Sequence, residues 1–469
     1  MPRSAPVKSC QPLAVGRRLC GKRSVIFVSY FPPEKISYIM KKISGEFVSG
    51  TEPGGYMMSV ASARTWDTKK IILLLIYVAV FLVAMKERTF YACVVIAALL
   101  SCWRQFRYGH EWRVGTLWIP GAIFMTCSLI STKFSYDWRF SLFNWCFLPL
   151  FYAIFYVLIV SYVRKKEQVR RFLAALLGGL LCVVFYGFLQ FFHIVDIAGD
   201  TANAAWVDAS RFPMLYRRLY STLQNPNLFA GYLLMMLGMA GAFFVSLKGK
   251  REKSWLGILI LLMGVLLLAT YSRGAWVAAA AMLAVLAMTY DKRLWLVFLA
   301  VPVVLFFYHG QITERFLSIF SREDTSTSMR FALWEATMAM INEHLLTGIG
   351  WGIYFATYPW YNFYIQDPTV VIYHAHNMYL HITAENGIPG AIGYFWFFYG
   401  HAVLGTKLWR KSKDPWVRAI GFGVMLFIVG LSVYGLCDHV LFGRRLSFLF
   451  YGLCALCMGR VLSEKNGNA

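Results

Sequence analysis

Residues 376–390 read HNMYLHITAENGIPG and open a long apolar run of the chain. If this stretch is helical, His376, Tyr379 and Thr383 share one face, because positions three and four apart are neighbours on a helix. The closing Gly-Ile-Pro-Gly predicts a bend in the helix below the histidine. The pattern places an imidazole at the rim of a membrane, where it either serves chemistry or simply opens an interfacial helix.

The composition indicates a membrane protein. Of the 469 residues, 58% are hydrophobic, and runs of about 20 apolar residues, enough to span a bilayer, recur along most of the chain. The net charge of +23 does not predict a nucleic-acid partner, because Lys and Arg form short clusters between apolar runs, which favours anchoring to a lipid bilayer with anionic leaflets. From Cys93 onward the cysteines lie in or beside apolar runs, so no disulfide framework is predicted.

The apolar runs predict an all-α integral membrane protein with about twelve transmembrane helices. The Lys and Arg clusters fall on alternate loops, which assigns that side of the membrane to the cytoplasm. Both termini are then inside, and the long loops 194–227 and 309–376 are outside. The expected spans are 71–86, 89–103, 114–131, 141–163, 172–193, 228–246, 255–271, 274–290, 294–308, 377–404, 417–437 and 446–461.

The chain divides into four expected parts. Residues 1–65 are basic and hold no apolar run long enough to span a membrane, so we expect a disordered tail or a mis-assigned start, with Met57 or Met58 as the natural first residue. The other parts are spans one to nine (66–308), a large external loop (309–376) and spans ten to twelve (377–469).

The loops expected on the outer side hold few positive charges, so each arginine or lysine in them calls for an explanation. Arg217 and Arg218 stand just ahead of Asn-Pro-Asn at 225–227, a turn sequence that would start the next span. Arg273 lies in the tight outer turn Tyr-Ser-Arg-Gly at 271–274. These arginines either bind a substrate or anchor the protein to lipid head groups.

The large external loop is expected to contain an amphipathic helix capped near Thr325–Ser328 and ended by glycines at 348 and 350. The following stretch, from Trp351 to Tyr364, is rich in aromatic residues and favours an interfacial belt over a platform for sugar rings. The apolar residues expected on one side of the helix are Phe331, Trp334, Met338, Ile341 and Leu345.

Away from the span ends, charged and histidine side chains occur only in the tenth span, as His381, Glu385 and His401. A transporter should show ionisable groups near the midplane on related broken helices. The sequence has neither that pathway nor an internal repeat, so chemistry at the outer membrane surface is the better interpretation.

Four motifs resemble those of the O-antigen ligase and polymerase superfamily, and the resemblance covers about 210–410. His376-Asn377, nine residues and then Gly-Ile-Pro-Gly resemble the pattern H-[NSQ]-x9-G-x-x-G, and the turn at 271–274 resembles the family's S-R-G. RLYSTLQNPN, from Arg218, resembles R-x-x-G-T-F-x-N-P-N but has Ser221 for Gly and Leu223 for Phe, which leaves Arg217 as a possible substitute for Arg218. Arg330 with Trp334 resembles R-x-x-x-W.

The resemblance implies a glycosyltransferase that uses a polyprenyl-pyrophosphate-linked glycan. His376 is then the catalytic residue that deprotonates the acceptor, a task suited to an imidazole. Arg218 and Arg273 bind the donor diphosphate, because a guanidinium pairs with two phosphate oxygens and keeps its charge. Possible supporting residues are Arg217, Asn377, Tyr379, Glu385 and Arg330.

The resemblance also implies a multi-pass protein of the bacterial cytoplasmic membrane with a site facing the periplasm. The acceptor is a glycolipid of the lipid A-core type, a growing glycan (a polymerase) or a protein (an O-oligosaccharyltransferase). A glycolipid flippase is the alternative from another class. We expect no cofactor and no metal, because the first external loop, Lys86–Arg88, lacks an acidic pair and Glu323-Asp324 is expected to cap the loop helix.

Cysteine labelling tests this topology. A cysteine placed at Thr357, in the second long loop, should react with a membrane-impermeant maleimide in cells whose inner membrane is intact. The unsubstituted protein gives the background from the ten native cysteines. Reaction only after permeabilising the inner membrane would contradict the orientation and the outward-facing site.

Overall fold

The computed structural model of the chain describes residues 67–109, 111–195, 218–299, 310–317, 325–362 and 371–465. Contacts divide the chain into 1–64 and 65–469, and the description concerns the second unit. Every regular element in the described ranges is a helix, so the predicted all-α class is confirmed. Outside these ranges lie the expected tail 1–65, Arg217, Glu323-Asp324, Phe363-Tyr364 and most of the expected span 294–308.

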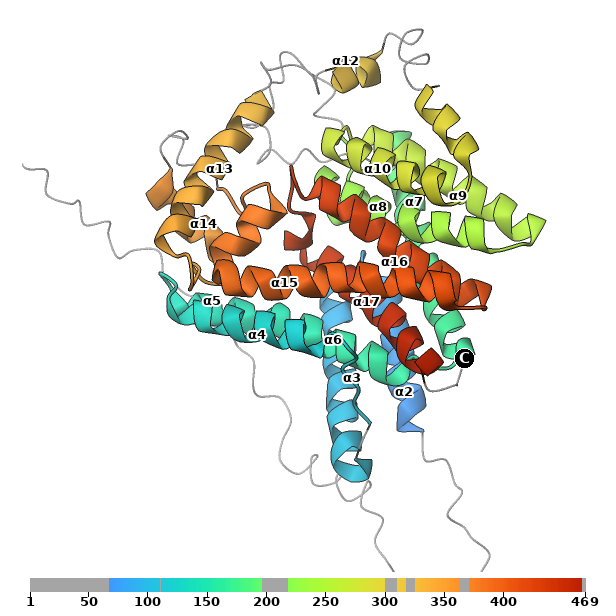
Figure 1. Cartoon of the computed structure of the whole chain (residues 1–469), viewed down its shortest axis with the longest axis horizontal. Coiled ribbons are helices and arrows are strands. Elements are labelled where there is room, and N and C mark those ends of the chain that lie inside the picture. The colour runs from blue at the N-terminus through green and yellow to red at the C-terminus, as the bar shows by residue number, and fades with distance from the viewer. Residues whose placement is uncertain are drawn as a thin grey trace, which may run out of the picture. The chain divides into compact units, whose positions relative to one another are not determined.

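The helices follow one another along the described chain (Figure 1). The α-helices are α2 Thr68–Leu82, α3 Glu87–Tyr108, α4 Trp118–Lys133, α5 Trp138–Phe147, α6 Pro149–Tyr162, α7 Lys166–Phe191, α8 Pro226–Ser246, α9 Lys250–Ala269, α10 Arg273–Thr289, α12 Gln311–Leu317, α13 Thr325–Glu343, α14 Tyr354–Thr357, α15 Met378–Lys411, α16 Pro415–Tyr434 and α17 Arg444–Lys465. The 3-10 helices are η4 Ser221–Leu223, η5 Lys292–Leu294, η7 Tyr358–Tyr361 and η8 Val440–Phe442.

Among the described residues, 7 helices are long and apolar enough to cross a membrane. This supports a multi-pass membrane protein, whereas the count of twelve spans and the loop placement stay predictions. The seven are Glu87–Tyr108, Trp138–Tyr162, Lys166–Phe191, Pro226–Ser246, Lys250–Ala269, Pro415–Tyr434 and Arg444–Glu464.

Asn-Pro-Asn starts α8 as the sequence predicts. The Asn225 side chain accepts the backbone N–H groups of Asn227 and Leu228 at 2.8 and 3.2 Å, and Pro226 occupies the first helical position. A proline fits there because its missing N–H would have no partner within the helix. An Asn cap of this kind stabilises a helix by about 1 kcal/mol, so the sequence fixes where α8 begins.

The start of α15 differs from the expectation. His376 was expected on a helix face with Tyr379, but it has φ 47° and precedes the helix, which begins at Met378. Asn377 takes the cap position, and its side chain accepts the backbone N–H groups of Tyr379 and Leu380. The expected shared face is therefore wrong. Asn377 caps the N-terminus of α15, because Asn favours this position, and His376 is left outside the helix.

The predicted bend occurs at Gly387, whose φ of 66° and ψ of 174° interrupt α15. The break leaves carbonyl groups without helical partners, and the segment after α13 satisfies them. The backbone N–H of Ile349 donates to Ala384 O at 2.9 Å, and that of Gly350 donates to Glu385 O at 3.2 Å. The bend thus ties the segment after α13 directly to α15.

The expected loop helix forms as α13, but it packs through a different face. Phe331 and Met338 are 59% and 44% exposed, so they do not form the packing side. The helix is apolar around much of its circumference, and its contact with the aromatic turn of α14 and η7 selects the buried side. The buried positions are Leu333, Ala336, Thr337, Met340 and Ile341.

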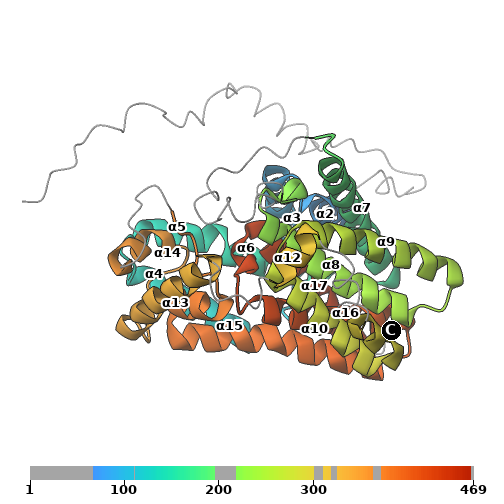
Figure 2. The same ribbon diagram turned by 90° about the horizontal axis from the view of Figure 1, so that it is seen from above.

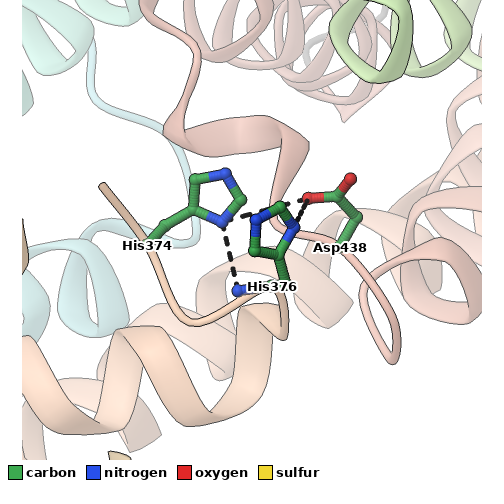
Figure 3. A group of neighbouring side chains, drawn as sticks. All are labelled: His374, His376 and Asp438. Atoms are coloured by element: carbon green, nitrogen blue, oxygen red, sulfur yellow. Dashed lines mark hydrogen bonds and ion pairs between the residues drawn. The ribbon is translucent and has the colours of Figure 1, made fainter. Parts of the chain in front are cut away.

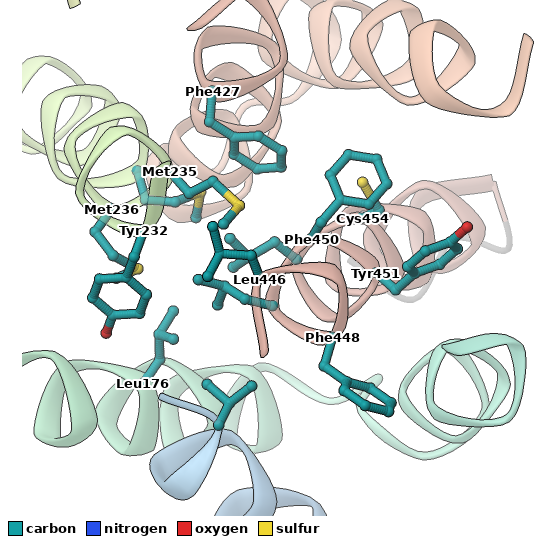
Figure 4. Packing of buried hydrophobic residues seen from close by; sticks show 14 of the residues in the cluster. Leu176, Tyr232, Met235, Met236, Phe427, Leu446, Phe448, Phe450, Tyr451 and Cys454 are labelled. Carbon is teal, nitrogen blue, oxygen red and sulfur yellow. The ribbon is translucent and has the colours of Figure 1, made fainter. Parts of the chain in front are cut away.

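The core lies where α8, α16 and α17 meet, and large side chains fill it. Figure 4 shows Tyr232 and Met235 of α8, Phe427 of α16 and Leu446 and Phe450 of α17 pointing into this space. Beside it, α15 packs along α4 and α16 (Figures 1 and 2). The end of α16 and the start of α15 are thereby held together.

Gly387→Ala should destabilise the protein. A Cβ at Gly387 would clash with the Leu346 carbonyl group, and the left-handed backbone alone costs an L-residue about 1–2 kcal/mol. The melting temperature of the purified protein in detergent should fall. Gly264→Ala on α9 is the matched control, because its Cβ would meet no atom within 4 Å. An unchanged melting temperature for Gly387→Ala would show that the bend does not depend on glycine.

Candidate active site

Arg218 joins two segments that are far apart in sequence. Its Nε donates to the Thr270 carbonyl at 2.7 Å, and its Nη2 donates to Asn227 Oδ1 at 2.6 Å. Thr270 directly precedes the Tyr-Ser-Arg-Gly turn, and Asn227 ends the Asn-Pro-Asn turn. The arginine therefore binds both predicted motifs, and its guanidinium is held in one orientation.

Ser221 explains how the chain departs from the family's glycine. Its φ is 49°, in the region that favours glycine. Two buried hydrogen bonds compensate for the strained backbone: the Ser221 amide donates to Gln190 Oε1 at 2.8 Å, and the hydroxyl donates to Val183 O at 2.7 Å. The turn that carries Arg218 is thus fixed to α7, which supports the register of the motif from Arg218.

Tyr434, the last residue of α16, connects the same segments to the end of the chain. Its hydroxyl lies 2.7 Å from Ser272 Oγ and donates to the Asn227 carbonyl at 3.3 Å. Because Ser272 uses its hydroxyl here, it does not cap α10. Three segments of the chain converge on this one phenol.

The histidine turn is bound to the segment that follows Tyr434. The backbone N–H of Met378 donates to Gly435 O at 2.7 Å, and Asn377 Nδ2 donates to Leu436 O at 3.0 Å. The bond from Met378 uses an N-terminal backbone donor that a helix leaves unsatisfied, and the bond from Asn377 uses the side chain of the cap residue. They also bring Asp438 to His376.

Asp438 and two histidines form a compact group (Figure 3). His376 Nδ1 lies 3.3 Å from Asp438 Oδ1, and His374 Nδ1 lies 3.9 Å from the same oxygen. The His376 amide donates to His374 Nδ1 at 3.1 Å. The Asp438 side chain is 4% exposed and that of His376 is 22% exposed, so the imidazole is the accessible member of the pair.

The surrounding charges keep Asp438 ionised. Burial would raise the pKa of its carboxyl, but His376, His374 and Arg330 outweigh burial and hold that pKa well below its usual value. Burial and His376 together lower the pKa of His374 well below its usual value. At neutral pH the group therefore combines a carboxylate with a neutral His374.

The predicted arginines lie near this group. Burial lowers the pKa of Arg218 to about 10, Tyr434 and Asp438 act in the opposite direction, and Arg330 and Arg273 lower it further. Arg218 is still protonated at neutral pH. Arg330 of α13 also lowers the pKa of Asp438, so Arg218 and Arg330 both interact with this carboxylate, and Arg273 acts on Arg218.

The other predicted residues have structural contacts. Asn377 caps α15 and holds the 435–436 backbone. The Tyr379 hydroxyl donates to Ser432 O at 3.0 Å and lies 2.9 Å from the Tyr399 hydroxyl. The Glu385 carboxylate accepts the Tyr354 backbone N–H at 3.4 Å and lies 3.5 Å from His381 Nε2. Glu385 thus supports the bend of α15 and the aromatic turn.

Asp438, His374 and Tyr434 were not among the predicted site residues. The motifs end near residue 410, and Asp438 lies in a short outer connection between two apolar runs. The sequence signal that could have identified Asp438 as a site residue is the presence of an acidic side chain in such a short connection. His374, His376 and Asp438 are also a described group that could hold a metal ion, with ligand atoms within 4.8 Å of one another.

Comparison with known proteins gives one family match. No curated protein matches the chain. Residues 257–395 match the model of the O-antigen ligase family, a range that contains Arg273, Arg330 and His376. This match confirms the resemblance read from the motifs and supports membership of the chain in the O-antigen ligase superfamily.

Proposed function

We propose that the protein is an O-antigen-ligase-like glycosyltransferase. It transfers a glycan from a polyprenyl-pyrophosphate carrier to an acceptor hydroxyl at the outer face of the cytoplasmic membrane. The observation that carries this proposal is the His376–Asp438 pair, with 3.3 Å between Nδ1 and Oδ1, whose carboxylate interacts electrostatically with Arg218 and Arg330, while Arg273 acts on Arg218. Anion-binding groups beside a base suit a reaction with a diphosphate leaving group and a hydroxyl nucleophile.

His376 acts as the general base. With Nδ1 at 3.3 Å from Asp438 Oδ1, the Nδ1–H donates to the carboxylate and Nε2 accepts the acceptor's proton. The acceptor oxygen bonds to the anomeric carbon of the donor glycan as the bond from that carbon to the diphosphate oxygen breaks. The electron pair leaves with the diphosphate, and Asp438 stabilises the imidazolium that forms.

The arginines bind the diphosphate and stabilise the charge that develops on it. Arg218 is already oriented by Thr270 O and Asn227 Oδ1, so its other N–H groups can reach phosphate oxygens without reorganisation. Arg273 is the first residue of α10, where the helix dipole also favours an anion. Because guanidinium groups supply this charge, the proposed reaction uses no metal and no cofactor.

A glycolipid of the lipid A-core type, a growing glycan and a protein would each offer the acceptor hydroxyl that this chemistry needs. The direct test is product formation by the purified protein in liposomes that contain a polyprenyl-pyrophosphate-linked glycan and one acceptor at a time. A flippase would instead move the donor across the bilayer and form no glycosylated acceptor with any of them.

His376→Ala and Asp438→Asn should both abolish most glycan transfer while donor binding persists. Loss of a general base costs roughly 10²–10⁴-fold in turnover. The neutral amide at 438 no longer stabilises the imidazolium, so turnover should fall within the same range. Turnover and donor binding are measured on the same purified variants.

His401→Gln is the matched control, because His401 is buried against Tyr156 on the later part of α15 and lies outside the proposed chemistry. If His376→Ala keeps near-normal turnover across a range of pH, His376 is structural and the base is another group. If only Asp438→Asn is silent, the carboxylate does not orient the base.

Arg218→Lys and Arg273→Lys should each lower transfer by roughly 10²-fold, the loss typical of one stabilising donor group. A lysine keeps the charge but offers a single ammonium where a guanidinium grips two oxygens. A residue that only anchors the protein to lipid head groups needs charge alone, so lysine would replace arginine there at little cost.

Arg217→Lys is the internal control and should be mild. Thermal stability is measured in parallel, because Arg218 also joins Thr270 to Asn227 and its loss can loosen the turn. A damaging Arg217→Lys beside a silent Arg218→Lys would shift the motif by one residue. Three silent variants with unchanged donor binding would refute the diphosphate role.

A further inference from the structure

We propose that His374, His376 and Asp438 form a binding site for Zn²⁺, and that a zinc ion bound there inhibits glycan transfer. The inference rests on the proposed function for its inhibitory consequence, whereas the binding itself depends on the geometry of the three side chains alone. It concerns regulation of the site and is compatible with a reaction that needs no metal.

The separations between donor atoms fit a tetrahedral zinc site. Zinc binds nitrogen and oxygen at about 2.0–2.2 Å, so two ligands of a tetrahedral ion lie about 3.4 Å apart. His376 Nδ1 and Asp438 Oδ1 are 3.3 Å apart, and His374 Nδ1 and Asp438 Oδ1 are 3.9 Å apart. All three donor atoms lie within 4.8 Å of one another, so small side-chain rotations close the site.

The chemical types of the three donor atoms determine which metal ion the site favours. Two imidazoles and one carboxylate suit Zn²⁺, whereas Mg²⁺ and Ca²⁺ prefer shells of oxygen ligands. The guanidinium of Arg330 acts on both His374 and Asp438 and opposes any cation. An ion held mainly by charge would therefore be excluded, and one with strong bonds to imidazole nitrogen is favoured.

The ligands are held in place before an ion arrives. The His374–His376 turn and the Asp438 segment are joined by the bonds from Met378 to Gly435 and from Asn377 to Leu436. The His374 and His376 side chains are 16% and 22% exposed, which provides an entry path and an open fourth position. Binding requires one exchange, since His374 Nδ1 must release the His376 amide.

Inhibition follows from the atom that the ion occupies. Zinc bound to His376 Nδ1 takes the place of the hydrogen bond to Asp438, and the neutral imidazole then carries its hydrogen on Nε2. Nε2 can no longer accept the proton of an acceptor hydroxyl. The same ion also neutralises Asp438, which otherwise stabilises the imidazolium.

The test uses zinc chloride alone with the full-length protein in detergent after treatment with a chelator. Calorimetry should show one saturable zinc site. His374→Asn should weaken binding at least 10-fold, because the amide oxygen of Asn can still accept the His376 N–H but is a poor zinc ligand. His193→Asn is the matched control, since His193 lies outside the group and its φ of 56° is tolerated by Asn, so zinc binding should be unchanged.

Transfer is then measured with and without zinc. Zinc should inhibit the native protein at the concentration where it binds, and a chelator should restore activity. Transfer by His374→Asn, measured relative to its own rate without zinc, should resist that concentration of zinc. The inference is overturned if the native protein has no saturable site, if His374→Asn binds zinc as tightly, or if bound zinc leaves transfer unchanged. A fully active His376→Ala variant would instead refute the proposed role of His376 as the base. The zinc binding that calorimetry measures on the native protein would still stand.

Discussion

The hydrogen bonds from Met378 and Asn377 to the Gly435–Leu436 backbone are the contacts on which the site depends. A helix that begins inside a protein leaves N–H groups that need partners, and α15 finds them in its own cap and in the segment after α16. The partners of this helix end thereby determine where Asp438 lies. The unsatisfied backbone of the helix end, together with the side chain of its cap residue Asn377, brings the carboxylate to the histidine.

The same region gathers like charges at an electrostatic cost. Arg218, Arg273 and Arg330 stand close enough to affect one another or the same carboxylate, and Asp438 offsets part of this positive charge. Bringing cations together without water is unfavourable unless an anion joins them. A diphosphate would relieve this repulsion, so binding the donor and stabilising the site would be one event.

The sequence predicted most of the described helices, because apolar runs and caps are local signals. Asn225 and Pro226 start α8 where expected, and Gly387 bends α15. The packing face of α13 could not be predicted, because apolar residues lie on several of its sides. The side that becomes buried is the one that contacts the aromatic turn of α14 and η7. Asp438 was missed for a different reason: its meeting with His376 depends on a tertiary contact between the ends of two helices.

Ser221 bears on any exchange of parts between members of this superfamily. Its left-handed backbone is sustained by bonds to Val183 and Gln190 of α7, where the family pattern has a glycine that needs no such support. The turn that contains Ser221 and helix α7 therefore depend on each other and have to be exchanged together. A chimera that takes the turn from this chain without its α7 would carry a strained serine without these partners, and the reverse graft, with glycine at this position, would remove the hydroxyl that donates to the Val183 carbonyl.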